Sequence, residues 1–407
     1  MVPKRLRPSS GGAFGAWRKL GRGVTPVAAM AALVGVVAAG LPAAAQAQKR
    51  GTAPAASYAA AADPVTLGLS TGYQWTMTRQ FLAPDLGKVT PMGIKNIRED
   101  IYWHNVQAVP GVWNWSFYDV LFTSAANQGV RILPILGYGV TWATGDTNIH
   151  VVPHTDKARA AYATFAAAVV RRYGPTGTFW KNNPKLPFLP ATAVEIWNEP
   201  WYPGPTDPAV YVALVKAASV AIHAAVPSMT VLAYVDDRYR SFGGGKAGVW
   251  MTAVLDSQRG LNQWVDGWSI HPYPRDHRVP ATKQAADSVA QVKNLHNQLA
   301  GRNLTGKIWI TEIGFHGRPS TFNASDSQAT ASASYKTLVQ AAGAMGGANP
   351  VTAVYAFTSA REAVIPNEKA GDFGYNLFGF DGRVMPVLAA FAQSTTVQSA
   401  TKVAPRK

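Results

Sequence analysis

Cysteine is absent from the 407 residues of this chain. Its absence excludes disulfide bonds, thiolate nucleophiles and Cys-ligated zinc. The stability of the fold must therefore come from its core. The composition allows a large core, because 47% of the residues are hydrophobic and only 15% are charged.

Acidic residues are also scarce. The chain has 22 Asp and Glu against 38 Lys and Arg, which gives a formal net charge of +16. Dense Lys/Arg runs are missing outside the N-terminal segment and the short tail Lys402–Lys407. This pattern indicates a diffusely basic surface, and we expect no nucleic-acid partner. An anionic glycan or a cell envelope is the alternative explanation of the charge.

The first 47 residues have the organisation of a secretory signal peptide. A basic segment without acidic residues precedes an apolar stretch from Val24 to Pro42, and Ala45-Gln46-Ala47 offers a cleavage site. A membrane anchor is the alternative, but this stretch is weakly apolar for a permanent span. We expect cleavage, a secreted protein of the extracellular space or cell envelope with no membrane partner, and a net charge of +10 once six basic residues are lost.

Beyond an Ala-rich leader (residues 48–62), short apolar runs alternate with runs of helical spacing. The runs typical of strands are Val65–Ser70, Ile94–Glu99, Val130–Leu136, Ala191–Trp197, Met229–Val235, Val265–Ile270, Lys307–Thr311 and Val351–Phe357. The helical runs are Phe81–Thr90, Ser116–Asn127, Asp156–Tyr173, Pro208–Ala225, Ala247–Arg259, Ala281–Ala300, Asp326–Ala344 and Met385–Gln393. This alternation predicts a single α/β domain, a (β/α)₈ barrel over residues 63–396, with a long loop at Arg361–Asp381 and a basic tail at 397–407.

Catalytic residues of such barrels lie at the carboxyl ends of the strands. The fourth predicted strand ends in Trp197-Asn198-Glu199-Pro200, and the seventh in Thr311-Glu312-Ile313-Gly314. Side chains at these two strand ends can face each other across the barrel. Retaining glycosidases need two carboxyl groups about 5–5.5 Å apart, and the positions of Glu199 and Glu312 at these strand ends permit that geometry. Glu195 lies inside its strand and is expected to be structural.

The two motifs resemble the acid/base and nucleophile motifs of clan A glycoside hydrolases, the "4/7" barrel enzymes. The resemblance covers roughly residues 66–393 and is greatest to family 39-like and family 5-like members. It implies that Glu199 is the acid/base and Glu312 the nucleophile of a double displacement.

Further residues match positions of the same clan. The resemblance implies that Arg98 keeps the nucleophile ionised, that Asn198 binds the sugar 2-hydroxyl, and that His271 and Tyr273 lie near the nucleophile. Phe357 stands where the clan usually has a Trp at the end of the eighth strand. Gly137-Tyr138-Gly139 replaces a His that family 5 carries after the third strand.

Aromatic side chains are abundant in the segments that follow the predicted strands. Apolar sugar faces stack on aromatic rings, so we expect Trp142, Trp201 and Phe357 to contact substrate. The resemblance implies a monomeric, secreted retaining β-glycosidase that hydrolyses a polysaccharide or oligosaccharide without a metal or other cofactor. A transglycosylase that remodels cell walls and a catalytically silent glycan-binding barrel are the alternatives.

Overall fold

Eight parallel strands close into a barrel in the computed structural model of the chain, in the order β1-β2-β3-β4-β5-β8-β9-β10. The structure describes residues 65–71, 79–202, 206–241, 247–257, 261–319, 323–358, 374–379 and 381–394. The predicted signal peptide, leader and basic tail, and most of the predicted loop 361–381, lie outside the described residues.

The barrel strands overlap all eight predicted runs, which confirms the (β/α)₈ prediction. Several of them are buried on both faces, β4 over its whole length, and this explains why they read as continuous apolar runs. Their bounds are β1 Thr66–Thr71, β2 Asn96–Tyr102, β3 Arg131–Gly137, β4 Ala193–Ile196, β5 Thr230–Val235, β8 Gly267–Ile270, β9 Lys307–Ile313 and β10 Val351–Thr358.

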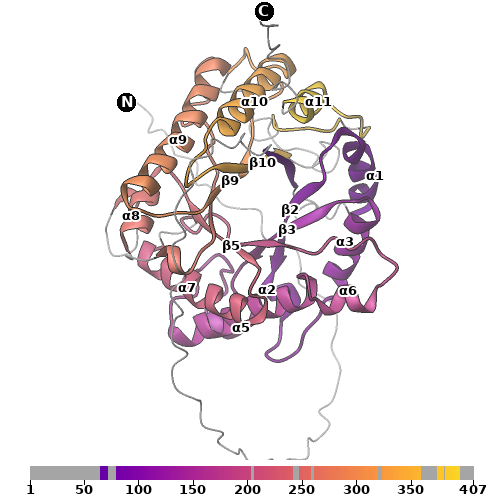
Figure 1. The fold of residues 1–407 in the computed structure, drawn as a ribbon, viewed down its shortest axis with the longest axis vertical. Coiled ribbons are helices and arrows are strands. Elements are labelled where there is room, and N and C mark those ends of the chain that lie inside the picture. Colours follow the sequence, from indigo (N-terminus) through magenta and orange to yellow (C-terminus); the bar gives the residue numbers. More distant parts are fainter. Residues whose placement is uncertain are drawn as a thin grey trace, which may run out of the picture. The chain divides into compact units, whose positions relative to one another are not determined.

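Helices surround the strands as an outer ring (Figure 1). Polar caps begin three of them: Thr155 accepts a hydrogen bond from the backbone N–H of Ala158, Asp207 from that of Ala209, and Ser327 forms a capping box with Thr330. The main helices are α1 Arg79–Val89, α3 Ser116–Asn127, α5 Asp156–Tyr173, α7 Pro208–Ala225, α8 Trp250–Ser257, α9 Ala281–Gly301, α10 Gln328–Gly343 and α11 Pro386–Gln393. Shorter ones are α2 Trp103–Val106, α4 Thr141–Thr144 and α6 Thr178–Asn182, with 3₁₀ turns at Thr90–Met92 and Leu261–Gln263.

The predicted helix Ala247–Arg259 was wrong at its first three residues. Residues Ala247–Val249 form strand β7, which pairs antiparallel with β6, Tyr239–Ser241, and only then does α8 begin. Three-residue strands are too short to show a period of two, so helical spacing masked this hairpin. The hairpin follows β5 and places Arg240 opposite Gly248.

Helix α7 is long and apolar enough to cross a membrane by length and composition alone. In the structure, however, Tyr211, Leu214 and Ile222 of this helix are buried in the main core. The Tyr211 hydroxyl donates a hydrogen bond to the backbone carbonyl of Ile196, at the end of β4, at 3.0 Å. The apolar character of α7 therefore serves packing against the barrel.

The interior of the barrel changes character along its axis. Toward the amino ends of the strands, Leu133, Leu232 and Tyr355 form a separate apolar cluster, on which Trp309 packs. Gly68 leaves room for this cluster, because a Cβ at its position would lie 2.5 Å from the Tyr355 ring. Toward the carboxyl ends, the buried interior side chains become polar and charged.

Candidate active site

The polar part of the interior is organised around Arg98 of β2. Its side chain is 2% exposed and donates hydrogen bonds to four different residues. Nε donates to Glu195 Oε2 at 2.6 Å, Nη1 to Glu312 Oε2 at 2.8 Å and to the Ser70 hydroxyl at 3.1 Å, and Nη2 to Asn198 Oδ1 at 2.7 Å. One guanidinium therefore ties β2 to β1, to β4, to the segment after β4 and to β9.

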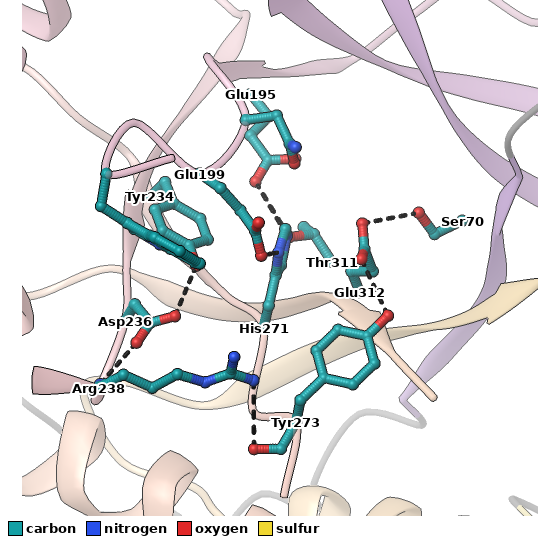
Figure 2. Close-up of polar contacts among 12 residues, drawn as sticks. Ser70, Glu195, Glu199, Tyr234, Asp236, Arg238, His271, Tyr273, Thr311 and Glu312 are labelled. Carbon is teal, nitrogen blue, oxygen red and sulfur yellow. Dashed lines mark hydrogen bonds and ion pairs between the residues drawn. The ribbon is translucent and has the colours of Figure 1, made fainter. Parts of the chain in front are cut away.

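Glu312 lies one residue before the end of β9, and its side chain is 17% exposed. Besides Arg98, the Tyr273 hydroxyl donates to its Oε1 at 2.9 Å, and the Ser70 hydroxyl lies 3.5 Å from Oε2 (Figure 2). The guanidinium of Arg98 and the phenol of Tyr273 each donate to a different oxygen of this carboxyl group, so its orientation is fixed.

Glu199 follows β4 in an unusual turn. Trp197 has a φ of 66° and Glu199 a φ of 40°, both in the left-handed region that non-glycine residues rarely adopt. Trp197 is fully buried and packs edge-on against Tyr138, which holds the turn in place. Such conformations persist only where the surrounding structure enforces them, and they concentrate at functional sites.

The carboxyl group of Glu199 has a different environment from that of Glu312. Burial raises the pKa of Glu199 above its ordinary value, and it prevails over Arg238, Arg98 and Arg240, which act to lower that pKa. Its Oε1 lies 3.1 Å from Nδ1 of His271. Burial lowers the pKa of His271 to about 4, so the imidazole is neutral near pH 7. Glu199 therefore holds a proton to a higher pH than an ordinary glutamate does.

The two glutamates lie close together. One oxygen of Glu199, one oxygen of Glu312 and one ring nitrogen of His271 all lie within 4.8 Å of one another. They are also the one group of three potential metal ligands in the part of the chain that the structure describes. Because Arg98 already places a positive charge 2.8 Å from Glu312, the arrangement suits acid–base and nucleophilic chemistry better than a metal ion.

Two predicted aromatic residues lie beside this group. Trp201 donates from Nε1 to the Tyr234 hydroxyl at 3.3 Å, and the Arg240 guanidinium carbon lies 3.7 Å from its ring centroid. Phe357 packs edge-on against Tyr273, with ring centroids 6.5 Å apart. One connected region therefore holds most of the predicted site residues: Glu199, Glu312, Arg98, Asn198, His271, Tyr273, Trp201 and Phe357.

Trp142 was predicted to contact substrate, but its contacts in the structure are with other parts of the protein. Its Nε1 donates to the backbone carbonyl of Gln107 at 2.8 Å, and its ring packs edge-on against the buried Trp103. These contacts join the segments after β2 and β3. They give Trp142 a packing role, and its contact with substrate stays a prediction.

Tyr375 is a site residue that the sequence did not single out. It lies in the segment after β10, and its ring contacts Tyr273 and Phe357 at centroid distances of 5.7 and 5.8 Å. A Cβ at Gly314 would lie 2.4 Å from this ring, so Tyr375 packs directly on the backbone just after Glu312. The glycine of the Thr311–Gly314 motif was the available signal, because a missing side chain at a strand end marks a close approach.

Tyr138 occupies the place of the family 5 histidine. Its phenol hydrogen-bonds the side chain of Asn198, and its ring stacks on Tyr102. Asn198 is therefore held from two sides, by Tyr138 and by Arg98. The tyrosine thus helps to fix the position of a predicted sugar-binding residue.

No family model and no curated protein matches this chain. Solved structures do match it. A family 39 glycoside hydrolase from the gut symbiont Bacteroides cellulosilyticus WH2 has a TM-score of 0.58 and 19% identity over 81% of this chain and 64% of that one. The chain has the fold of family 39 and family 5 glycoside hydrolases.

Two further structures illustrate the range of this similarity. A monomeric beta-xylosidase from Caulobacter crescentus CB15 has a TM-score of 0.58 and 20% identity over 82% of this chain and 69% of that one. A GH5_18 protein from Bifidobacterium longum subsp. longum ATCC 55813 has a TM-score of 0.59 and 13% identity over 84% of this chain and 82% of that one. The chain spans just under two thirds of the length of the Bacteroides enzyme.

The buried ion pair of Arg98 predicts a pH-dependent loss of stability on substitution. Arg98→Met leaves the fully buried Glu195 without its cation, and we expect the free energy of unfolding to fall by about 3–5 kcal/mol at pH 7. Burial acts to raise the pKa of Glu195, but Arg98 and His271 bring it below the ordinary value. The stability that this lowered pKa contributes is present above the unfolded-state pKa of about 4.3 and is lost as the pH falls through the folded-state pKa.

Wild type should therefore lose more stability on acidification than Arg98→Met, in which Glu195 can take up a proton. Urea unfolding at pH 7 and at about pH 4 measures the difference in the free energy of unfolding between wild type and Arg98→Met. This difference should be smaller at about pH 4. Arg278→Met is the matched control, because Arg278 is 75% exposed and its ion pair with Asp276 lies at the surface; it should leave the free energy of unfolding nearly unchanged. If wild type and Arg98→Met differed by the same free energy of unfolding at both pH values, this account of Glu195 would be contradicted.

Proposed function

We propose that this protein is a retaining β-glycosidase that hydrolyses O-glycosidic bonds of a polysaccharide or oligosaccharide. The proposal depends on one observation, the approach of a Glu199 oxygen and a Glu312 oxygen to within 4.8 Å. Retaining enzymes hold their carboxyl groups about 5–5.5 Å apart, whereas inverting enzymes leave about 6.5–9.5 Å for a water molecule. The spacing here favours direct attack by a carboxylate.

The raised pKa of Glu199 and the fixed orientation of Glu312 match the two steps of this reaction. In the first step, Glu312 attacks the anomeric carbon as the glycosidic C–O bond breaks, and protonated Glu199 gives its proton to the departing oxygen. In the second step, ionised Glu199 takes a proton from water, whose oxygen replaces Glu312 at the same carbon. Arg98 and Tyr273 orient Glu312 between these steps.

Asn198 is positioned to recognise the sugar that reacts. Its Oδ1 accepts from Arg98, so its Nδ2 remains the donor side of the amide. A donor beside Glu199 suits the sugar 2-hydroxyl, a contact that strengthens at the transition state. The names of the structural neighbours, a beta-xylosidase and an exo-beta-1,4-mannosidase, make β-xylosides and β-mannosides the first substrates to test.

We predict that cleavage retains the anomeric configuration. Two successive displacements at one carbon restore the starting geometry, so a β-glycoside should first release the β-anomer. Proton NMR of the first product, recorded before mutarotation, measures this outcome. First appearance of the α-anomer would require a water molecule between the glutamates and would refute the double displacement.

We predict that Glu199→Ala separates the two steps. A dinitrophenyl glycoside scarcely needs an acid, so its first turnover should stay fast while the glycosyl–enzyme accumulates. Azide needs no base, so it should restore turnover and form a β-glycosyl azide. The pH–rate profile should lose the alkaline limb that reports deprotonation of Glu199.

The matched control is Glu195→Ala, since Glu195 is fully buried behind Arg98 and contacts no reacting atom in this scheme. Azide should not rescue it. Failure of azide to rescue Glu199→Ala, with the alkaline limb intact, would assign the acid/base role to another residue.

We further propose that the protein is exported. The basic and apolar character of residues 1–47 supports this, with cleavage after Ala47. Expression in a bacterial host that secretes proteins, followed by N-terminal sequencing, should give a mature protein that begins at Gln48. Retention of the whole segment in a membrane fraction would instead establish an anchor.

A further inference from the structure

Two aromatic residues follow Glu199 within three positions of the chain. Trp201 is half-buried, and Tyr202 is 59% exposed. We propose that these two rings, here called the aromatic corner, bind a pyranose on the leaving side of the scissile bond, and that the same site admits a second sugar that accepts the glycosyl group. The inference rests on the proposed glycosidase function and adds glycosyl transfer to it.

One turn of the backbone holds both the proposed acid and the aromatic corner. The backbone N–H of Tyr202 donates to the backbone carbonyl of Glu199 at 2.8 Å, and Glu199 itself has a φ of 40°. The rings of Trp201 and Tyr202 have centroids 5.8 Å apart and planes inclined at 71°. The two rings therefore meet edge to face, and the turn that places the acid also places them.

The indole of Trp201 is anchored to β5. Its Nε1 donates to the Tyr234 hydroxyl at 3.3 Å, and this hydroxyl in turn donates to Asp236 Oδ2 at 2.9 Å (Figure 2). Asp236 is buried, and the backbone N–H of Arg238 donates to its other carboxylate oxygen at 2.6 Å. An indole held in this way has little freedom left to lose when a sugar stacks on it, so the aromatic corner is preorganised for binding.

Tyr234 supports the proposed acid as well as the indole. Its ring packs edge-on against the imidazole of His271, with ring centroids 4.8 Å apart, and Nδ1 of His271 lies 3.1 Å from Glu199 Oε1. Trp201 and Glu199 are thus positioned through the same tyrosine. A sugar that stacks on Trp201 is held in a constant position relative to the proton that its glycosidic oxygen receives.

The contacts of Trp201 and Glu312 place the aromatic corner on the leaving side. Glu312 is contacted by side chains of β1, of β2 and of the segment after β8. Trp201 instead contacts side chains of β5 and of the β6–β7 hairpin. The attacked carbon lies at Glu312 and the departing oxygen at Glu199, so a sugar beyond that oxygen meets the residues that follow Glu199.

The chemistry of the aromatic corner fits a pyranose. The Arg240 guanidinium carbon lies 3.7 Å from the Trp201 ring centroid, so one face of the indole is covered and a ligand stacks on the other. The C–H face of a pyranose with equatorial hydroxyls is flat and apolar, as this contact requires. The exposed phenol of Tyr202 adds a hydroxyl that both donates and accepts, which suits the hydroxyls at the edge of the same sugar.

Such a site serves two molecules in turn. Once the first sugar has left, the glycosyl group is an ester of Glu312, and Glu199 is ionised. A hydroxyl oxygen of a second sugar then attacks the anomeric carbon, the bond to Glu312 breaks, and Glu199 takes the hydroxyl proton. This step forms a new β-glycosidic bond and restores both glutamates. Stacking on the aromatic corner holds the second sugar at the place that water takes in hydrolysis.

The test starts from the glycosyl–enzyme. Dinitrophenyl 2-deoxy-2-fluoro-β-glycosides of xylose, mannose, glucose and galactose should release dinitrophenol and leave a slowly hydrolysed ester on Glu312. After excess reagent is removed, the recovery of activity is followed in buffer and with xylobiose, mannobiose or cellobiose as acceptor. We expect at least one disaccharide to speed recovery about tenfold, with saturation, while glycerol has little effect. Mass spectrometry should detect the fluorinated trisaccharide.

Substitutions should then locate the acceptor site. The readout is the ratio of the recovery rate with acceptor to the recovery rate in buffer, taken separately for each variant. Trp201→Ala and Tyr202→Ala should remove most of the stimulation, whereas Tyr202→Phe should keep the part that depends on the ring. Phe188→Ala is the matched control, because Phe188 is another exposed aromatic residue and lies in the segment that precedes β4; its ratio should equal that of wild type. Near-UV circular dichroism checks that each variant keeps its fold.

The outcomes separate this inference from the glycosidase proposal. Stimulation by none of the disaccharides, equal stimulation by glycerol, or stimulation that both Ala variants retain would overturn the acceptor site. In each of these cases, labelling of Glu312 followed by recovery in buffer leaves the glycosidase proposal standing. Failure of every fluorinated sugar to label Glu312, or labelling of another carboxylate, would refute the glycosidase mechanism and this inference with it.

Discussion

The site depends on the ion pair between Arg98 and Glu195. A guanidinium inside a barrel must be compensated, and Glu195 supplies this charge from the middle of β4 without facing the reacting atoms. Glu195 in turn accepts a hydrogen bond from the Thr311 hydroxyl at 3.0 Å, in the residue before Glu312. Because Nε is committed to Glu195, the planar guanidinium is fixed, and its two other nitrogens can hold Glu312 and Asn198 in one geometry.

Sequence reasoning succeeded where one local rule decided the outcome. Buried strands read as apolar runs, and in a barrel the carboxyl ends of those strands carry the site; this was enough to bring Glu199 and Glu312 together. It also assigned Glu195 a structural place, since a glutamate within a buried strand needs an internal partner. That partner is Arg98, which the sequence analysis had assigned to Glu312 alone. Its simultaneous contact with Glu195 depends on the closure of the barrel.

The features that were missed depend on contacts between distant segments. Tyr375 lies more than sixty residues after Gly314 in the sequence, and only the folded chain shows that its ring packs on that glycine. Together with Phe357 it forms an aromatic group against Tyr273, where the clan usually has one Trp. Likewise, Arg240 looked like part of a diffuse basic surface, and only the folded chain shows that its guanidinium carbon lies 3.7 Å from the ring centroid of Trp201, two residues after Glu199.

The apolar cluster at the amino end of the barrel has a consequence for the charges beside it. Leu133, Leu232 and Tyr355 are buried next to the layer that holds Arg98, so apolar side chains border the charged groups on this side. Apolar surroundings lower the local dielectric, and a lower dielectric strengthens the attraction of Arg98 for Glu195 and Glu312.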